Sequence, residues 1–321
     1  MPAVRVSRAA GMVLAADGLD MSTPSKSVSL VLGSGGARGL AHIGVIQWLT
    51  ENGYEIRSIS GSSMGALVGG IYAARKLHVY AEWVSALERA HVIRLLDPTL
   101  GRSGLFKGER IIGVLRELIG DCDIADLPLS YTAVATDIES GEEVWLREGR
   151  LFDAIRASMA TPLVFTPFKH GERTLLDGAL VNPLPVAPTV DDGTDLTIAV
   201  NLGGPAELRP APPQPVRANG GNAYGKRIGD FVAALRPSRT SGESARGLLD
   251  VALVSMQTMH DTIARLKLAA HTPDVTVEIP RNACGYHEFW RADELIALGR
   301  ERAAQSLAGR ERAGPAGDIG A

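Results

Sequence analysis

The sequence predicts an α/β protein, a three-layer α/β/α sandwich in which helices cover both faces of a mostly parallel sheet. The main observation is that short apolar, partly β-branched segments alternate with helical segments from residue 28 to about residue 202. A second observation is that two of these strands run directly into glycine-rich turns that open helices. With 321 residues, 45% of them hydrophobic, the chain is long enough for one substantial core.

The first glycine-rich turn follows the strand predicted at residues 28–32. It has the sequence Gly-Ser-Gly-Gly-Ala-Arg-Gly at positions 33–39, and a helix is expected from about residue 40 to residue 51, ended by Asn52 and Gly53. Such a loop presents backbone N–H groups to an anion, which can be a dinucleotide phosphate or the oxyanion of an acyl-transfer reaction. A purely structural loop is the third interpretation.

Three features disfavour a nucleotide site. Gly33, Gly35 and Gly39 do not have the spacing G-x-G-x-x-G, no acidic residue closes the second predicted strand, and no Gly-Lys-Ser/Thr sequence is present. The oxyanion interpretation is therefore preferred, and it requires a nucleophile nearby.

The second glycine-rich turn supplies a candidate nucleophile, Ser63. The sequence Gly-Ser-Ser-Met-Gly at positions 61–65 lies between a strand predicted at residues 56–60 and an apolar helix predicted at residues 66–74. Glycines on either side of a serine allow the sharp strand-to-helix turn that exposes its hydroxyl, and the helix N-terminus stabilises a developing alkoxide. The alternative is a glycine-rich turn with an incidental serine.

Asp177 is the candidate general base. It follows a short strand predicted at residues 173–176 and precedes Gly178 and Ala179. An acidic residue in this position is often only a turn former, but together with Ser63 it can accept the nucleophile's proton. Further strands are expected at residues 131–135, 143–146, 196–200 and 275–277.

In this combination the chain resembles the patatin-like phospholipase family, particularly its compact bacterial members. The resemblance rests on residues 35–39, 61–65 and 177–179, which have the order of the family's glycine-rich loop, nucleophile elbow and Asp-Gly-Ala/Gly motif. It runs from about residue 28 to residue 307 and includes the segments at 135–137, 155–158, 181–185 and 289–296. Ser34 departs from the family's loop pattern but leaves Gly35 and Gly36 in place.

The resemblance implies a patatin-like fold and a Ser–Asp dyad. Ser63 would attack the ester carbonyl of a phospholipid or lysophospholipid, and Asp177 would take the serine proton with no imidazole between them. An acyl-enzyme would form on Ser63, and water would release the fatty acid. No cofactor is expected.

The resemblance also assigns roles within the glycine-rich loop. Backbone N–H groups around Gly35, Gly36 and Ala37 would hold the tetrahedral oxyanion. Arg38 would steady the loop or attract a phosphate head group.

The seven histidines do not form a recognisable motif. His260, His271 and His287 follow Asp177 in the chain order of an α/β-hydrolase triad, but each is expected to pack or to face solvent. His42, on the helix after the glycine-rich loop, is expected to have a structural role. The sequence contains no HExxH or Cys/His spacing for a metal site.

Composition excludes several partners and compartments. A net charge of −3 gives no electrostatic basis for binding nucleic acid, and Cys122 and Cys284 are too few for a disulfide framework, which suits a reducing cytoplasm. No apolar run approaches the ~20 residues of a membrane span. A cytoplasmic enzyme with peripheral, transient membrane contact is therefore expected. Nothing in the sequence indicates an oligomeric state.

The expected organisation is a flexible tail at residues 1–26, a catalytic core at 27–202, a Pro/Gly-rich and partly disordered loop at 203–243, a helix-strand-helix unit at 244–307 and a frayed tail at 308–321. Met21 is an alternative start. The connection at 95–107 is ordinary or a lipid-facing flap. The apolar stripe of the helix expected at 245–270 is assigned to core packing, with a membrane or dimer surface as the alternative.

Three functions remain open at this point. A hydrolase and a transacylase would use the same dyad and differ in the acyl acceptor. A non-catalytic lipid-binding adaptor would have kept only the fold. Because both Ser63 and Asp177 are present, the sequence favours a lipid acyl hydrolase of phospholipase A or lysophospholipase type.

Overall fold

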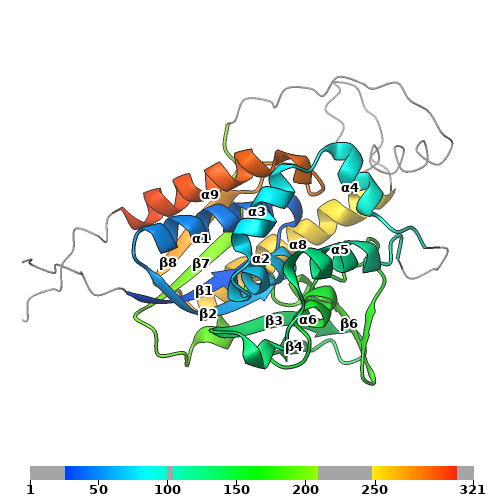
Figure 1. The fold of residues 1–321 in the computed structure, drawn as a ribbon, viewed down its shortest axis with the longest axis horizontal. Helices are drawn as coiled ribbons and strands as arrows, with labels where there is room; N and C mark the ends of the chain where they lie inside the picture. The colour runs from blue at the N-terminus through cyan, green and yellow to red at the C-terminus, as the bar shows by residue number, and fades with distance from the viewer. Residues whose placement is uncertain (1–25, 100–103, 209–247, 309–321) are drawn as a thin grey trace, which may run out of the picture.

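The computed structural model describes residues 26–99, 104–208 and 248–308, and the strands in these ranges form one sheet (Figure 1). The strand order is β5-β6-β3-β2-β1-β7-β8, and β4 lies beside β3. The strands are β1 Ser27–Leu32, β2 Glu55–Ser62, β3 Ser130–Asp137, β4 Glu143–Leu146, β5 Phe168–His170, β6 Arg173–Asp177, β7 Leu196–Gly204 and β8 Val275–Pro280.

The centre of the sheet is parallel. Strands β3, β2, β1, β7 and β8 pair in parallel, whereas β4, β5 and β6 add antiparallel pairs at one side. The carboxyl ends of β1 and β2 therefore lie side by side, and both glycine-rich turns start at this edge. The predicted mostly parallel sheet is confirmed.

Helices connect and cover the strands. They are α1 Ala41–Glu51, α2 Met64–Ala73, α3 Leu77–Ser85, α4 Arg89–Leu95, α5 Glu109–Ile119, α6 Leu151–Ser158, α8 Leu248–Ala270 and α9 Ala292–Leu307. Short 3-10 turns also occur, at η1 Gly36–Leu40, η2 Ile124–Asp126, η3 Gly178–Leu180, η4 Ala187–Thr189 and η5 Phe289–Arg291.

The alternation of side chains along β1 shows how the two faces of the sheet are covered. Leu30 and Leu32 belong to the large core that includes buried residues of α1, α2 and α9. Val31 points to the other face, where it packs in a smaller core with Ala199 of β7 and Ala264 of α8. The sheet thus lies between two helical layers, as the predicted α/β/α sandwich requires (Figure 1).

The apolar stripe of helix α8 was expected to pack in the core, but part of it faces solvent. Four members of its predicted core stripe are exposed: Val251, Val254, Met259 and Leu266. Its inward side carries Ala264 of the smaller core and also polar groups that bond to the rest of the chain, namely Gln257 to Arg38 and Lys267 to Glu143. Assigning the apolar stripe to core packing was therefore wrong for these four residues.

Some boundaries also differ from expectation. The helix predicted from residue 40 is preceded by the 3-10 turn η1, which takes in most of the glycine-rich loop. Strand β7 continues to Gly204, past the expected end of the core at residue 202. The expected tails at residues 1–25 and 309–321 and the expected loop from residue 209 onward lie outside the described residues. None of the helices in the described ranges is long and apolar enough to cross a membrane.

Candidate active site

Ser63 stands on a strained turn between β2 and α2. Its backbone has φ 56° and ψ −119°, a conformation that non-glycine residues rarely adopt. The turn can be this tight because Gly61 and Gly65 lack side chains. A Cβ on Gly65 would lie 2.0 Å from the carbonyl oxygen of Leu32, and one on Gly61 would lie 2.5 Å from the nitrogen of Ala66.

The turn brings Ser63 to Asp177 at the end of β6. The Ser63 hydroxyl donates a hydrogen bond of 2.8 Å to Oδ2 of Asp177, although the two residues are 114 positions apart. Only 3% of Ser63 and 1% of Asp177 is exposed to solvent. The two residues that the sequence singled out are therefore in direct contact in a buried site.

Asp177 is held by further hydrogen bonds. The hydroxyl of Thr161 donates to Oδ2 over 2.6 Å, and the amide of Ala179 donates to Oδ1 over 2.9 Å. Burial raises the pKa of Asp177, while the bonds from Thr161, Ala179 and Ser63 work in the opposite direction. The raised pKa makes this carboxylate a stronger base than an exposed aspartate.

Ser158 at the end of α6 accepts a hydrogen bond from the backbone of the nucleophile turn. The amide of Ser63 donates to the Ser158 hydroxyl over 2.9 Å, and that hydroxyl donates to the carbonyl of Val134 in β3 over 2.6 Å. The unusual backbone of Ser63 is thus fixed to both a helix and a strand of the core.

The glycine-rich loop lies beside Ser63, and its amides differ in availability. Within the described residues, the amides of Gly35 and Gly36 have no hydrogen-bond partner, and Gly36 has φ 58°. The amide of Ala37, by contrast, donates to the carbonyl of Tyr286 over 2.8 Å. Of the three predicted oxyanion donors, two are therefore free and the third is engaged.

Arg38 points into the protein. Its guanidinium donates to the carbonyl of Gly35, the carbonyl of Arg281 and the side chain of Gln257, over 3.1, 2.9 and 2.7 Å. Burial lowers the pKa of Arg38, with small opposing contributions from nearby groups. With its donors taken by protein acceptors and 3% of its surface exposed, Arg38 is placed to steady the loop and not to attract a head group.

Tyr286, on the segment between β8 and α9, covers the glycine-rich loop. A Cβ on Gly36 would lie 2.7 Å from the Tyr286 ring, so the two are in close contact. Its hydroxyl lies beside Thr161 and near Asp177. The residue as a whole is 36% exposed, but its hydroxyl end lies inside the site. Loss of water around this hydroxyl, and then the negative charge of Asp177, raise the pKa of Tyr286 to about 12, and the hydrogen bond with Thr161 partly opposes the rise.

His260 on α8 lies near Asp177 but not between it and Ser63. Its Nε2 atom is buried with no hydrogen-bond partner among the described residues. Burial lowers the pKa of His260, and the charges of Asp177 and Asp261 partly oppose this. The sequence did not foresee this proximity. Ser63 bonds Asp177 directly, with no imidazole between the two side chains.

Three other histidines have different surroundings, and one of them, His287, lines the same pocket as Ser63. His271 is exposed, and His287 packs edge-on against Trp290. His42 is fully buried on α1, where its Nε2 atom donates to the carbonyl of Gly33 over 2.8 Å. His42 therefore supports the glycine-rich loop, in line with the structural role expected for it.

Ser63 opens onto an apolar pocket of about 140 Å³. Helices α3, α4 and α5 and the turn η5 contribute apolar side chains to its wall, and Thr161 and Tyr286 line it together with Ser63. Representative wall residues are Tyr80, Trp83, Leu96, Phe106, Phe165 and Trp290. A nucleophile at the end of an apolar cavity can meet an ester whose hydrocarbon chain lies in the cavity.

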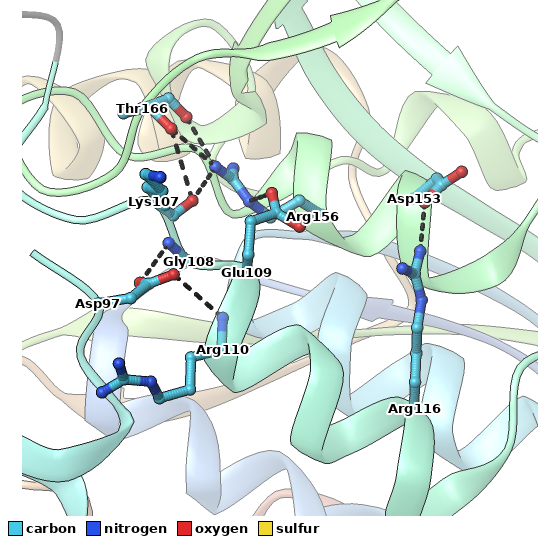
Figure 2. Close-up of polar contacts among 9 residues, drawn as sticks. All are labelled: Asp97, Lys107, Gly108, Glu109, Arg110, Arg116, Asp153, Arg156 and Thr166. Carbon is cyan, nitrogen blue, oxygen red and sulfur yellow. Dashed lines mark hydrogen bonds and ion pairs between the residues drawn. The ribbon is translucent and has the colours of Figure 1, made fainter. Parts of the chain in front are cut away.

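Arg156 on α6 fixes two loops at the margin of this pocket (Figure 2). Its guanidinium donates to the carbonyl of Lys107 and to the carbonyl and hydroxyl of Thr166, the last two over 3.0 and 3.1 Å. An ion pair with Glu109 at the start of α5 adds a 3.5 Å contact. The loop before α5 and the loop after α6 are thereby held together.

No group of metal-binding side chains occurs in the part of the chain that the structure describes.

Comparison with known proteins shows the family to which this chain belongs. A family model described as Patatin-like phospholipase matches residues 30–190. An uncharacterized NTE family protein of Mycobacterium tuberculosis is 38% identical over 333 residues, which cover 88% of this chain and 92% of that protein. The chain belongs to the patatin-like phospholipase family. Membership in this family supports lipid hydrolase activity in general.

Other members and one solved structure are also similar. Lysophospholipase NTE1 of Pyricularia oryzae is 29% identical over 286 residues, which cover 85% of this chain and 18% of that protein. The crystal structure of VipD from Legionella pneumophila covers 89% of this chain and 67% of that chain, with a TM-score of 0.41 and 12% identity.

Three residues at the candidate site of this patatin-like phospholipase were not predicted: Ser158, Thr161 and Tyr286. Thr161 reaches Asp177 because the amide of Asp177 donates to the carbonyl of Ala160 over 3.0 Å, which brings the two segments together. Ser158 lies in the segment at 155–158, which was singled out only for its family resemblance. No local pattern marks Tyr286.

Proposed function

We propose that this protein is a serine acyl hydrolase that cleaves the carboxyl esters of phospholipids or lysophospholipids. The observation that carries this proposal is the 2.8 Å hydrogen bond from the Ser63 hydroxyl to the buried carboxylate of Asp177 at the wall of an apolar pocket. Family membership supports the same class of reaction.

Asp177 acts as the general base. As Ser63 attacks the ester carbonyl, its proton passes to Oδ2 of Asp177, and no other group need carry it. An unperturbed aspartate has a pKa of about 3.9 and is a weak base, so the raised pKa of Asp177 favours the transfer. Thr161 and Ala179 keep the carboxylate aimed at the hydroxyl.

The oxyanion of the tetrahedral intermediate is held by the amides of Gly35 and Gly36 and by the N-terminus of α2. A preorganised donor of this kind is typically worth about 2.7–4 kcal/mol of transition-state stabilisation. Ala37 joins them only when its hydrogen bond to the Tyr286 carbonyl opens. Arg38 keeps the loop in place through Gly35.

The acyl chain of the substrate lies in the apolar pocket, which ends at Ser63. Attack forms an acyl-enzyme and releases the alcohol part of the ester, and a water molecule then frees the fatty acid and regenerates Ser63. The name of the relative Lysophospholipase NTE1 supports a lysophospholipid as a substrate of this chain as well.

The test compares Ser63→Ala and Asp177→Asn with the unmodified protein, measuring fatty acid released from lysophosphatidylcholine. Both variants should lose hydrolysis by about 10³-fold or more, as removal of triad members does in other serine hydrolases. Ser62→Ala is the matched control. Its hydroxyl is buried on the same turn with no hydrogen-bond partner among the described residues, so hydrolysis should persist.

A fluorophosphonate probe gives an independent readout. It should label the unmodified protein and Ser62→Ala at Ser63, and it should not label Ser63→Ala. Normal turnover by Asp177→Asn would overturn the dyad, and an unlabelled, folded parent protein would indicate a non-catalytic member of the family.

A further inference from the structure

Two exposed leucines are direct chain neighbours of residues that line the apolar pocket. Leu105 is 39% exposed and Leu163 is 46% exposed. They lie on different loops, Leu105 before α5 and Leu163 after α6. Large apolar side chains at the surface are common singly, but a pair next to an apolar cavity suggests a binding surface.

The two loops are joined to each other through their backbones. The amides of Leu105 and Phe106 both donate to the carbonyl of Val164, over 3.2 and 2.9 Å. Beneath them, buried Arg156 binds the carbonyls of Lys107 and Thr166 (Figure 2). Leu105 and Leu163 are therefore presented together on a fixed support.

The neighbours of the two leucines face inward. Phe106, next to Leu105, and Val164 and Phe165, next to Leu163, all line the pocket that holds Ser63. The exposed leucines are thus continuous with the apolar wall. A lipid leaving a bilayer at this point would pass from the leucines to the pocket without crossing a polar surface.

Leu163 has a backbone conformation that leucine rarely adopts. Its φ is 67°, it follows Pro162, and the amide of Val164 donates to the carbonyl of Thr161 over 3.1 Å. This is the pattern of a type II β-turn, in which glycine or asparagine is usual at the position that Leu163 occupies. An exposed leucine held in a strained conformation points to a role at the surface.

The charge around the leucines favours a phospholipid surface. Glu109 pairs with Arg156, whereas Asp97 accepts from the amides of Gly108 and Arg110 at the start of α5 and keeps its negative charge. Lys107 is exposed beside Leu105, and its ammonium group makes no ion pair with any described residue. Arg110 is exposed as well, and its guanidinium donates to the carbonyls of Arg94 and Leu96. Among the described residues here, two cations, Lys107 and Arg110, therefore stand against the single unpaired carboxylate of Asp97, and this positive balance suits anionic head groups.

We propose that Leu105 and Leu163 insert into the surface of a phospholipid bilayer, with Lys107 at the head groups, and so place the pocket opening against the membrane. The inference rests on the proposed lipid hydrolase function, because it names the surface from which that site takes its substrate. The turn that carries Leu163 begins at Thr161, so docking and the Asp177 carboxylate share one short segment.

The test measures binding in the catalytically silent Ser63→Ala background, so that lipid turnover does not alter the vesicles. Co-sedimentation with phosphatidylcholine vesicles containing phosphatidylglycerol should weaken by about tenfold or more in Leu105→Ser/Leu163→Asn, because two apolar side chains no longer enter the bilayer. Lys107→Gln should weaken binding to these vesicles and leave binding to pure phosphatidylcholine vesicles unchanged.

Val190→Ser/Leu266→Ser is the matched control. These side chains are 60% and 65% exposed, but Val190 precedes the amino end of β7, whereas Ser63 follows the carboxyl end of β2. Leu266 lies 13 positions along α8 from Leu253, the residue of α8 that lines the pocket. The control should bind vesicles like its parent.

Leu163→Asn alone should raise the midpoint of thermal unfolding, since asparagine tolerates a positive φ.

In active protein, Leu105→Ser/Leu163→Asn should hydrolyse a water-soluble short-chain ester at the parent rate and should hydrolyse vesicle lipid more slowly than the parent does.

Equal vesicle binding by the parent, the leucine variant and the control would overturn the proposal, as would a parent that does not bind vesicles. A parent dimer broken by the leucine changes, without vesicle binding, would assign the surface to a second copy. A parent that binds vesicles but cleaves no ester would contradict the hydrolase function alone.

Discussion

Thr161 and Ser63 bond to the same oxygen of Asp177, over 2.6 and 2.8 Å. The carboxylate is therefore approached from two sides by hydroxyl groups, one on the nucleophile and one on the loop after α6. Both hydrogen bonds favour the ionised form of Asp177, whereas burial disfavours it. The balance between these effects sets the strength of the proposed base.

Thr161→Val should lower kcat by roughly 10–100-fold, the scale on which loss of a positioning contact acts. It should also shift the acid limb of the pH profile upward, because the lost bond from Thr161 held the pKa of Asp177 down. Thr161→Ser should restore both properties. If Thr161→Val lowered activity without moving the pH profile, Thr161 would have only a packing role.

The unmodified protein should lose activity in acid at a pH above that of an ordinary aspartate. Burial raises the pKa of Asp177, and only the ionised form can accept the Ser63 proton. The value of kcat/KM for an uncharged ester should therefore fall as the pH falls through the raised pKa of Asp177. This pKa lies above the value of about 3.9 for an unperturbed aspartate. A rate that stays constant down to about pH 4 would contradict the assignment of Asp177 as base.

His42 should make the folded state weaker in acid. Burial lowers the pKa of His42 to about 4 in the folded protein, whereas in the unfolded chain this pKa is near 6.5. Between these two pH values the unfolded chain therefore binds a proton more readily than the folded protein does. The contribution of His42 to the free energy of unfolding is fully present above pH 6.5 and is lost as the pH falls toward about 4. The total loss is about 3 kcal/mol.

The measurement for His42 is urea unfolding at several pH values between 4 and 7. His42→Gln keeps a donor for the Gly33 carbonyl and removes the titrating ring. Its free energy of unfolding should depend less on pH over this range. Identical pH dependence in both proteins would show that other groups dominate acid unfolding.

Arg156→Met should destabilise the protein by roughly 2–4 kcal/mol, because the carbonyls of Lys107 and Thr166 lose the buried guanidinium that donates to both of them. Glu109→Gln is the control, since it removes only the exposed partner of Arg156 and should cost less than about 1 kcal/mol. Thermal and urea unfolding measure both. Equal effects of the two changes would mean that the ion pair, and not the carbonyl contacts, holds the loops.

The sequence by itself determined the features that depend on local spacing. The apolar strands, the two glycine-rich turns, the position of Ser63 on a strand-to-helix turn and the mostly parallel sheet all follow from residue types a few positions apart. The division of the chain into core, loop and C-terminal unit stays a prediction.

Only the tertiary structure decided which groups meet across long separations. It joined Thr161 to Asp177, engaged the Ala37 amide with the Tyr286 carbonyl and turned Arg38 inward. It also left four residues of the expected apolar stripe of α8 exposed and placed polar groups beside apolar ones on the inward side of this helix. Such contacts leave no periodic signal, because a buried polar group is stabilised by a partner whose position depends on how distant segments pack.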